Sequence, residues 1–289
     1  MHTKEVILSY LSTSISNHLA NLSEDFFRQM TELRLRTNKP IFAYCLNSNQ
    51  KEKKLDYNPT ALDIAETMER ISQYSFYAME EELRMGYITL PGGHRVGVVG
   101  KAVVENGQIK TIRPISGVNI RISRAVNGCG DSILPQLLDK KSNNKLPHNT
   151  MIISPPGCGK TTLLRDIIRQ FSDNCELTVG VVDERSEIGN IGLRTDLLDS
   201  SPKAEGMILL LRAMSPDVIA VDELGGAKDA QAVEDVSNAG VRLLCTVHGY
   251  DVCDIMQKPS LRQLLDKGIF KKFVVLTKPG EEGQVYDSN

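Results

Sequence analysis

The spacing of hydrophobic residues in the first part of the chain predicts helices followed by strands. Between Thr3 and Met30 hydrophobic residues recur at helical spacing, so this stretch is expected to be helical. In Glu32–Cys45 apolar and polar positions alternate, which is typical of extended chain. Thr60 is a favourable N-cap residue, and the apolar residues that follow it predict a helix that continues to Gly86.

From Tyr87 onward the pattern changes to short alternating segments that are broken by turns. Asn106-Gly107 is a dipeptide typical of tight hairpins. The expected strands are Tyr87–Leu90, Arg95–Val104, Ile109–Ile112 and Asn119–Ser123. Together with the preceding helices, these strands predict a smaller N-terminal α+β domain over residues 1–126.

The segment 127–149 is rich in Gly, Asp, Lys and Asn around one short apolar helix, Ile133–Leu138, and is expected to link two domains. Strands and helices then alternate over residues 150–289, which predicts a mostly parallel sheet covered by helices on both faces. The expected strands are Thr150–Ser154, Leu177–Asp183, Val218–Asp222, Val241–Val247 and Phe273–Lys278. The expected helices are Lys160–Phe171, Ala204–Met214, Ala230–Ala239 and Leu261–Lys267.

Composition narrows the class of protein. The 289 residues are 41% hydrophobic and 24% charged, as in an ordinary globular protein. The net charge of −2 excludes a chain whose whole surface is built to bind nucleic acid, since neutralising phosphates needs an excess of Lys and Arg. No apolar run approaches the ~20 residues of a membrane span. The six cysteines lack metal-ligand spacing, so we expect reduced thiols in the cytoplasm and no zinc site.

One segment departs from this charge balance. Between Arg95 and Arg124 the chain has six Lys or Arg residues against one acidic residue, Glu105. This excess is compatible with a solvated strand face and equally with a site for an anionic ligand. The sequence leaves both interpretations open.

The motif with the most specific chemistry is MIISPPGCGKTTLLRD, which predicts a buried strand, a Gly-containing turn and a helix. In a P-loop, main-chain N–H groups and a helix N-terminus bind phosphates. Lys160 is expected to reach the β- and γ-phosphates of ATP, and the Thr161 hydroxyl to bind Mg²⁺. Ser154 stands where the motif has its first Gly, which requires a negative φ there. The expected nucleotide-binding residues are Ser154, Pro155, Pro156, Gly157, Cys158, Gly159, Lys160, Thr161 and Thr162.

Acidic residues end two other predicted strands. A carboxylate at the carboxyl end of a parallel strand lies in the crevice where ligands bind. We therefore expect Asp222 to hold Mg²⁺ through water and Glu223 to orient and deprotonate the attacking water. The alternative is that both acids cap the next helix. Asp183-Glu184 ends another strand, which makes Glu184 an alternative catalytic base.

His248 ends the strand that follows the Asp222 strand, in the sequence Thr246-Val247-His248. At the same sheet edge as Lys160, its imidazole can donate to a γ-phosphate or to Glu223, so we expect a catalytic role. The alternative is a structural histidine at a strand end.

The order of these motifs resembles the secretion and pilus ATPase superfamily. Its Walker A, Asp box, Walker B and His box match Ser154–Thr162, Asp183–Glu187, Asp222–Glu223 and Thr246–His248. The superfamily commonly has Gly before the Walker B Glu, where this chain has Asp222. The resemblance implies a RecA-like P-loop domain of the additional-strand kind, and a homo-oligomer that forms a hexameric ring.

More narrowly, nearly the whole chain is similar to the stage III sporulation protein AA family. The stretches that carry this similarity are Glu32–Pro40, Val181–Gly189, Gly192–Asp199, Pro202–Met207 and Ser215–Gly226. The similarity implies a cytoplasmic ATPase of the mother cell in endospore-forming bacteria. It also implies that membrane proteins of the channel complex between mother cell and forespore are its partners.

The same resemblance implies roles for five arginines. The N-terminal domain of secretion motors closes over nucleotide, and Arg113, Arg121 and Arg124 lie where that domain directs arginines toward phosphate. Arg194 and Arg212 are candidates for arginines that act between subunits. The basic excess between Arg95 and Arg124 is then explained without nucleic acid.

Three functions are compatible with these motifs. A secretion-motor-like ATPase that powers or assembles the channel accounts for all of them. A nucleic-acid-stimulated ATPase with Arg95–Arg124 as its groove is disfavoured by the low total charge and the lack of an aromatic–basic platform. A non-hydrolysing nucleotide switch is disfavoured because Glu184 and Glu223 are both present.

Overall fold

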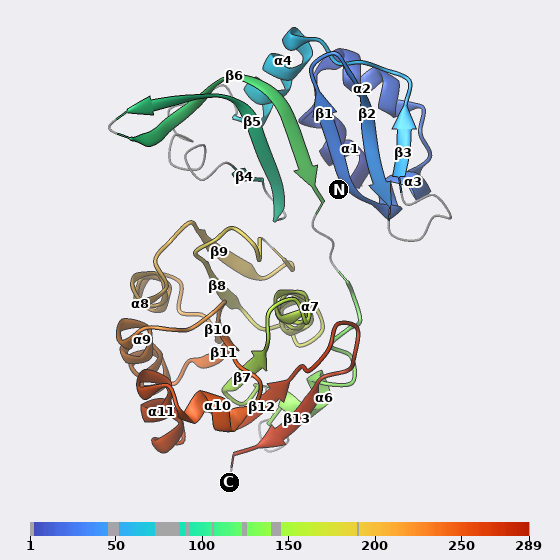
Figure 1. The fold of residues 1–289 in the computed structure, drawn as a ribbon. Helices are drawn as coiled ribbons and strands as arrows, with labels where there is room; N and C mark the ends of the chain where they lie inside the picture. The colour runs from blue at the N-terminus through green and yellow to red at the C-terminus, as the bar shows by residue number, and fades with distance from the viewer. Residues whose placement is uncertain are drawn as a thin grey trace. The chain divides into compact units, whose positions relative to one another are not determined.

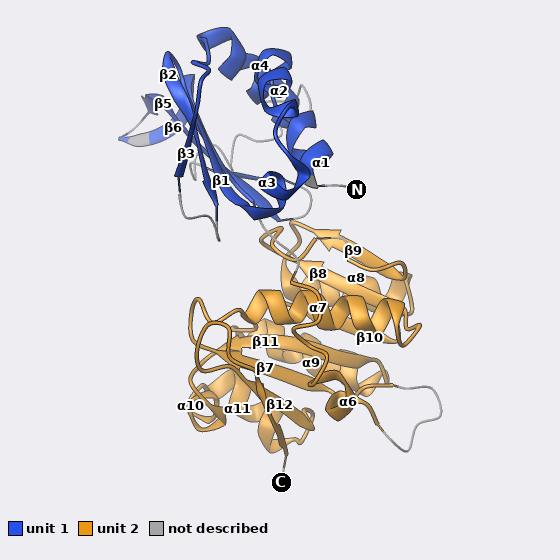
Figure 2. Ribbon diagram, turned by 90° about the vertical axis from the view of Figure 1, so that its right-hand side faces the viewer, with its two compact units in different colours: residues 1–123 blue, residues 124–289 orange. Residues whose placement is uncertain are grey.

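The computed structural model has two compact units, residues 1–123 and 124–289, and each has its own hydrophobic core (Figure 1). Figure 2 colours the two units separately. The α/β fold class predicted from the sequence is confirmed, with a sheet in each unit. The structure describes residues 3–45, 52–72, 87–90, 93–105, 107–122, 126–139, 146–189 and 191–288.

The N-terminal stretch is helical, but it forms separate short helices where the sequence suggested continuous helix. Their bounds are Thr3–Ser9 for α1, Thr13–Ala20 for α2 and Glu24–Gln29 for α3. The breaks fall at Ser12 and Ser23, because each is the N-cap of the helix that follows. Their side chains accept the N–H groups of Ile15 and Phe26, which satisfies donors that a helix start leaves unpaired.

The extended region after α3 is a hairpin rather than one strand. Strand β1 spans Met30–Arg36, β2 spans Lys39–Cys45 and β3 spans Glu52–Leu55. The turn between β1 and β2 contains Asn38, whose φ of 58° is the left-handed conformation that Asn tolerates well. The sequence did not predict β3, because Glu52-Lys53-Lys54 lacks hydrophobic alternation.

Helix α4, Ala61–Ile71, begins where the sequence predicts. The Thr60 hydroxyl accepts the N–H of Asp63 at 3.1 Å, and the Asp63 carboxylate accepts the N–H of Thr60 at 2.8 Å, which makes a capping box. The expected continuation to Gly86 lies outside the described residues. Figure 2 shows α1, α2 and α4 along one face of the N-terminal sheet.

Three further strands complete this sheet. Strand β4 spans Tyr87–Leu90, β5 spans His94–Glu105 and β6 spans Gln108–Arg121. The strand order is β3-β2-β1-β6-β5-β4, and every pairing is antiparallel. The two strands predicted within β6 are continuous across Pro114. The β5–β6 register shifts at Gly100, opposite Ile115, because the neighbouring Pro114 has no N–H to donate.

The second unit contains the mostly parallel sheet that the sequence predicts. Its strands are β7 Thr150–Ser154, β8 Val179–Asp183, β9 Thr195–Asp199, β10 Val218–Val221, β11 Arg242–His248, β12 Lys272–Val275 and β13 Gln284–Asp287. Their order is β13-β12-β7-β11-β10-β8-β9. Among the described strands of this second sheet, only the β12–β13 pairing is antiparallel. Strand β11 therefore lies between β7 and β10. This is the position of the additional strand in a RecA-like domain.

Helices cover both faces of this sheet. Their bounds are α6 Leu134–Leu137, α7 Lys160–Asp173, α8 Lys203–Ala213, α9 Ala227–Asn238, α10 Val252–Met256 and α11 Pro259–Asp266. Successive residues of β7 point to opposite cores: Ile152 packs with α7, whereas Met151 and Ile153 pack with α8, α9 and α11. No helix within the described ranges is both long and apolar enough to cross a membrane.

The segment expected to be a linker is partly packed into the second unit. Ile133 and Leu137, in and beside α6, are buried in the core that α7 shares. The preceding turn is held by Asp166 of α7, whose Oδ2 accepts the N–H groups of Gly128 at 3.0 Å and Gly130 at 2.8 Å. The apolar residues of this short helix therefore hold the segment against α7 and the second sheet, although most of the segment is polar.

The Asp166 carboxylate also accepts hydrogen bonds from Arg169 at 2.7 Å and Gln170 at 2.9 Å. Burial alone would raise the pKa of Asp166, but the hydrogen bonds from Gly130, Arg169, Gly128 and Gln170 outweigh it and hold the pKa below its usual value. A carboxyl group with a depressed pKa stabilises the folded state only while it is ionised.

We expect Asp166→Asn to lower the free energy of unfolding by about 1–3 kcal/mol at pH 7, because it removes a buried, hydrogen-bonded charge. The stabilisation is complete above the unfolded pKa of about 3.9 and is lost as the pH falls through the lower folded pKa. Urea unfolding of both proteins at pH 7 and in acid measures this. The matched control is Asp235→Asn, at an exposed position of α9. A difference that does not shrink in acid would contradict this account.

Candidate nucleotide-binding site

A strand, a turn and a helix bring the predicted phosphate-binding residues together. Strand β7 ends at Ser154 and α7 begins at Lys160. Gly157 and Gly159 have φ angles of 78° and 90°, which glycine adopts without steric cost. The first N–H groups of α7 have no partner within the helix, so this end of the helix favours a bound anion.

Ser154 fits the position where the motif has glycine. A serine at this position was expected to need a negative φ, and the φ of Ser154 is not positive, so its Cβ causes no strain. The buried side chain donates a hydrogen bond to the Pro155 carbonyl at 2.6 Å. Pro155 and Pro156 then lead into the glycine turn, and Lys160, Thr161 and Thr162 form the first turn of α7.

The two residues expected to hold the metal ion contact each other. The Thr161 hydroxyl donates to Oδ2 of Asp222 at 3.1 Å, although 61 residues separate them in the sequence. Oδ1 of Asp222 accepts a hydrogen bond from the Thr246 hydroxyl. Hydroxyl and carboxylate oxygens are the donors that Mg²⁺ binds in proteins, so Thr161 and Asp222 fit this ion. The ion would neutralise charge on the bound phosphates.

Glu223 follows Asp222 directly, and Asp222 is the residue that contacts Thr161 of the phosphate loop. Its φ is 54°, which is uncommon for a residue with a side chain. Its backbone N–H donates to the Thr246 hydroxyl at 2.8 Å. Its carboxylate accepts a hydrogen bond from Arg185 at 2.8 Å. Arg185 was not singled out from the sequence, because the pair joins residues 38 positions apart.

The second candidate base, Glu184, is paired elsewhere. Its carboxylate accepts a hydrogen bond from Lys203, the first residue of α8. The neighbouring Asp183 accepts N–H groups from Glu187 at 2.9 Å and Ile188 at 2.7 Å, so it orders the loop after β8. Burial raises the pKa of Asp183, and the hydrogen bonds from this loop oppose that rise. Of the two candidate bases, Glu223 is the one adjacent to the Thr161–Asp222 contact.

His248 lies beside the start of the phosphate loop. It is opposite Ser154 in the parallel β11–β7 ladder, and its Nδ1 is 3.2 Å from the Ser154 carbonyl oxygen. The backbone carbonyl of His248 accepts a hydrogen bond from Lys258. The structure therefore places this imidazole at the sheet edge that the sequence predicted, next to the phosphate loop.

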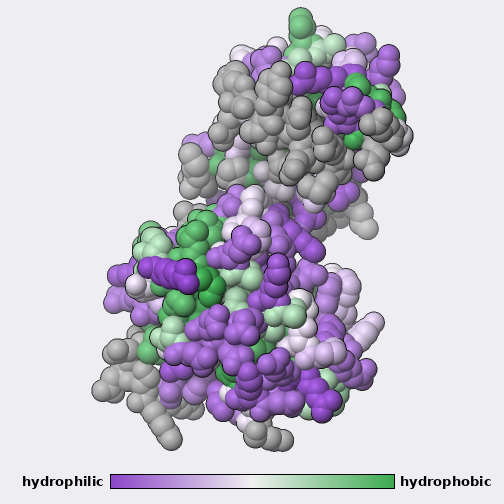
Figure 3. Space-filling view, turned by 90° about the vertical axis from the view of Figure 1, so that its left-hand side faces the viewer, coloured by the Kyte–Doolittle hydropathy of each residue, from purple (hydrophilic) through white to green (hydrophobic). Residues whose placement is uncertain are grey.

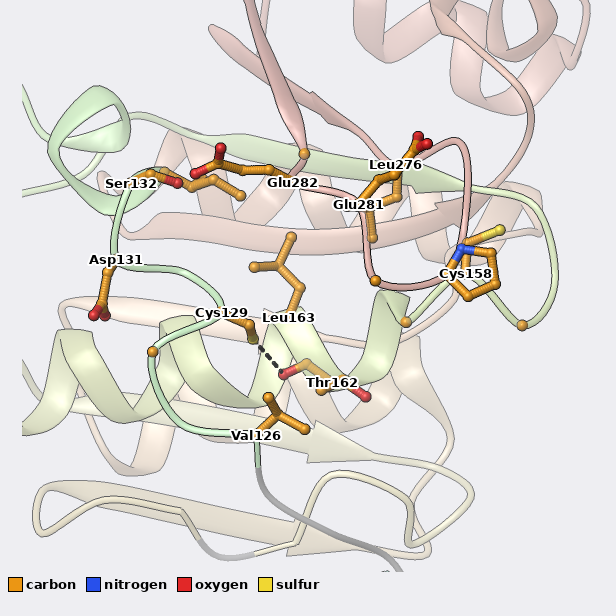
Figure 4. Close-up of a pocket in the computed structure, with 17 residues that line it drawn as sticks. Val126, Cys129, Asp131, Ser132, Cys158, Thr162, Leu163, Leu276, Glu281 and Glu282 are labelled. Carbon is orange, nitrogen blue, oxygen red and sulfur yellow. Dashed lines mark hydrogen bonds between the residues drawn. The ribbon is translucent and has the colours of Figure 1, made fainter. Parts of the chain in front are cut away.

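A pocket of about 570 Å³ opens beside the phosphate loop (Figure 4). Gly157, Cys158, Gly159 and Thr162 form one wall, and segments 126–133 and 276–283 form the others. Figure 4 shows Cys129 next to Thr162, whose carbonyl oxygen is 3.8 Å from the Cys129 sulfur. Neither of the last two walls was predicted from the sequence. The first lies almost wholly in the expected linker, residues 127–149, and the second runs from the end of the last expected strand, Phe273–Lys278, to residue 283.

Cys158 provides a direct test of whether this pocket binds nucleotide. Its thiol, half-buried, donates to the Thr277 carbonyl oxygen at 3.5 Å, across the pocket rim. We expect bound nucleotide to slow alkylation of Cys158, because the ligand fills the adjoining space. Peptide mass spectrometry measures the labelling rate of each cysteine. Exposed Cys253 is the internal control, and equal protection of both cysteines, or of neither, would contradict this prediction.

Of the five arginines implied by resemblance, Arg194 and Arg212 belong to the second unit and do not line this pocket. Arg113 and Arg121 are exposed on β6 of the first unit, and Arg124 lies outside the described residues. Arg194 precedes β9, and its N–H donates to the Ser172 hydroxyl at 2.8 Å. Arg212 lines a groove of about 710 Å³ between α8 and α9. Figure 3 shows hydrophobic surface on this side of the second unit.

Comparison with known proteins decides the family. A family model for sporulation stage III protein AA matches residues 1–288. The chain belongs to the sporulation stage III protein AA family. Stage III sporulation protein AA from Bacillus subtilis is 39% identical over 299 aligned residues, which cover 98% of this chain and 95% of the relative. The family predicted from the sequence is thus confirmed.

Two solved structures support the fold of this family member. The ATPase DotB from Legionella pneumophila has a TM-score of 0.56 and 18% identity, covering 91% of this chain and 75% of DotB. The pilus retraction motor PilT with bound ADP has a TM-score of 0.53 and 14% identity, covering 90% of this chain and 80% of that one. At these identities the likeness establishes a common fold, so activity has to be argued from the site.

Proposed function

We propose that this chain binds ATP together with Mg²⁺ and hydrolyses it. The observation that carries the proposal is the contact between Thr161 and Asp222 at the start of α7, with Glu223 beside it. A hydroxyl from the phosphate loop and a carboxylate from the end of β10 converge there on one point. This is the arrangement needed to hold a metal ion against bound phosphates.

The proposed reaction assigns a task to each side chain. Lys160 and the N–H groups at the start of α7 bind the phosphates. Glu223 accepts a proton from water as the water oxygen bonds to the γ-phosphorus. The bond from that phosphorus to the bridging oxygen breaks, and ADP leaves with the electron pair. We assign to His248, which lies next to Ser154, the task of responding to the γ-phosphate.

The cellular role is proposed from the family. The Bacillus subtilis relative is named for stage III of sporulation, so we infer a role in endospore formation in the mother-cell cytoplasm. We infer that the chain forms a ring, as a hexamer, and that ATP hydrolysis powers or assembles a channel complex of membrane proteins. Mass measurement in solution tests the ring, and stimulation of the ATPase by those membrane proteins tests the role.

Nucleic acid remains the alternative ligand for the basic segment, and the structure offers less support for it. Lys110 is paired with Glu105 at 2.7 Å, and the Arg95 guanidinium lies 5.6 Å from the centre of the Tyr87 ring. Two of the six basic residues are therefore already engaged within the first unit. A continuous groove for a phosphate backbone would need them directed to the ligand.

We expect Arg113→Ala and Arg121→Ala each to weaken ATP binding or slow turnover by about ten- to a hundredfold without nucleic acid, because a charge-assisted contact to phosphate is lost. Steady-state phosphate release by each variant, alone and with single-stranded RNA or DNA, measures this. Lys101→Ala, another basic position of the first unit, is the matched control. Unchanged basal rates together with lost stimulation would instead favour the nucleic-acid-stimulated ATPase.

A further inference from the structure

We propose that Thr246 is a positioning residue that holds both carboxylates at the end of β10 in their working places. The inference rests on the proposed ATPase function. Thr246 lies on β11, the strand between β7 and β10, and is fully buried. Its side chain forms hydrogen bonds with the turn that contains Asp222 and Glu223.

Three hydrogen bonds join Thr246 to this turn. Its hydroxyl donates to Oδ1 of Asp222 and accepts the N–H of Glu223 at 2.8 Å. Its backbone carbonyl accepts the N–H of Leu224 at 2.9 Å. A hydroxyl has one hydrogen to donate, so donation to Asp222 leaves its lone pairs for Glu223. One side chain thus orients the first carboxylate and fixes the backbone from which the second one projects.

The conformation of Glu223 explains why the turn needs this support. A φ of 54° is sparsely populated for residues with a Cβ and persists where the surroundings over-determine it. Thr246 supplies that constraint through the N–H groups of Glu223 and Leu224. Without the hydroxyl, the Glu223 N–H loses its partner and Oδ1 of Asp222 is free to turn.

The expected consequence is a loss of alignment with little loss of binding. Thr161 still donates to the other oxygen of Asp222. Among the described residues, the side-chain hydrogen bonds of Thr246 go to Asp222 and Glu223 and not to the phosphate loop. Reacting groups that are misplaced by about 1 Å can cost a hundredfold in rate. Turnover is therefore expected to fall while nucleotide affinity is retained.

The experiment compares Thr246→Val, which keeps the shape but cannot hydrogen-bond, with Thr246→Ser, which keeps the hydroxyl. We expect Thr246→Val to lower kcat about ten- to a hundredfold with KM unchanged, and Thr246→Ser to restore most of the rate. Amide hydrogen exchange in peptides containing Glu223, measured without nucleotide or Mg²⁺, should be faster in the valine variant. The matched control is Thr150→Val on β7, where a buried hydroxyl donates to the His148 carbonyl, and it should leave kcat unchanged.

Three results would overturn the inference. The first is wild-type kcat in Thr246→Val, and the second is unchanged amide exchange around Glu223. The third is an equal loss of rate in the serine and valine variants that follows their loss of thermal stability, which is the behaviour of a purely structural threonine. A wild-type chain that binds ATP but releases no phosphate would instead overturn the proposed function, so the two failures are distinguishable.

Discussion

Glu223→Gln is expected to keep ATP bound and to lower kcat by about 10²- to 10⁴-fold, because the amide has nearly the same shape but cannot accept a proton from water. Glu223 is the carboxylate that adjoins the Thr161–Asp222 contact. The measurement is steady-state phosphate release beside equilibrium binding of ATP in the presence of Mg²⁺. Since the variant binds but does not turn over, it should retain ATP through gel filtration.

Glu184→Gln is the matched control for this prediction. Both glutamates are ion-paired, Glu223 with Arg185 and Glu184 with Lys203, but only Glu223 directly follows Asp222, which contacts Thr161. The amide variant of Glu184 should therefore retain most of the wild-type rate. Wild-type turnover in Glu223→Gln together with a large loss in Glu184→Gln would assign the base to Glu184 and contradict the assignment made here.

Lys160→Ala is expected to weaken nucleotide binding by about a hundredfold or more. Lys160 is the first residue of α7 and directly follows the glycine turn, so its ammonium group is expected to reach phosphates bound by the turn. Charge-assisted hydrogen bonds are worth about 1.5–3 kcal/mol each, and one lysine can contact two phosphates. Binding of ADP and of ATP to the purified variant, followed by calorimetry, measures the loss.

Two controls separate this effect from misfolding. The thermal midpoint of Lys160→Ala without nucleotide should equal that of the wild type, because the Lys160 side chain is only half-buried. Lys228→Ala, at an exposed lysine on α9, should bind nucleotide normally. If Lys160→Ala bound ATP as tightly as the wild type, the phosphates would have to lie elsewhere.

The parts of the fold that the sequence predicted well are those with strong local patterns. Strand β10 is an apolar run, Val218–Val221, and β7 and β11 are similar, so the parallel sheet could be recognised. Edge strands were missed because their local pattern is weak: β9, Thr195–Asp199, is only partly buried. The breaks at Ser12 and Ser23 were missed because the apolar spacing continues across both caps.

In the candidate site, too, residues within a local motif were predicted, and contacts made only by the tertiary fold were missed. The phosphate loop is one contiguous motif, and the structure brings its residues to the Asp222 carboxylate. Arg185 and Thr246 act on Asp222 or Glu223 across strands, and a contact that is made only by the tertiary fold leaves no local pattern. Residues 127–149 were interpreted as a linker from their polar composition, yet residues 128–133 form part of a wall of the pocket.

Single-turnover hydrolysis distinguishes an ATPase from a chain that only binds nucleotide. The purified chain, in excess over radiolabelled ATP and with Mg²⁺, is quenched at successive times, and ATP and ADP are separated. We expect the wild type to convert the bound ATP to ADP, Glu223→Gln to hold it as ATP, and Lys160→Ala not to bind it. Bound ATP that stays intact in the wild-type chain would contradict the account and indicate a nucleotide switch without hydrolysis.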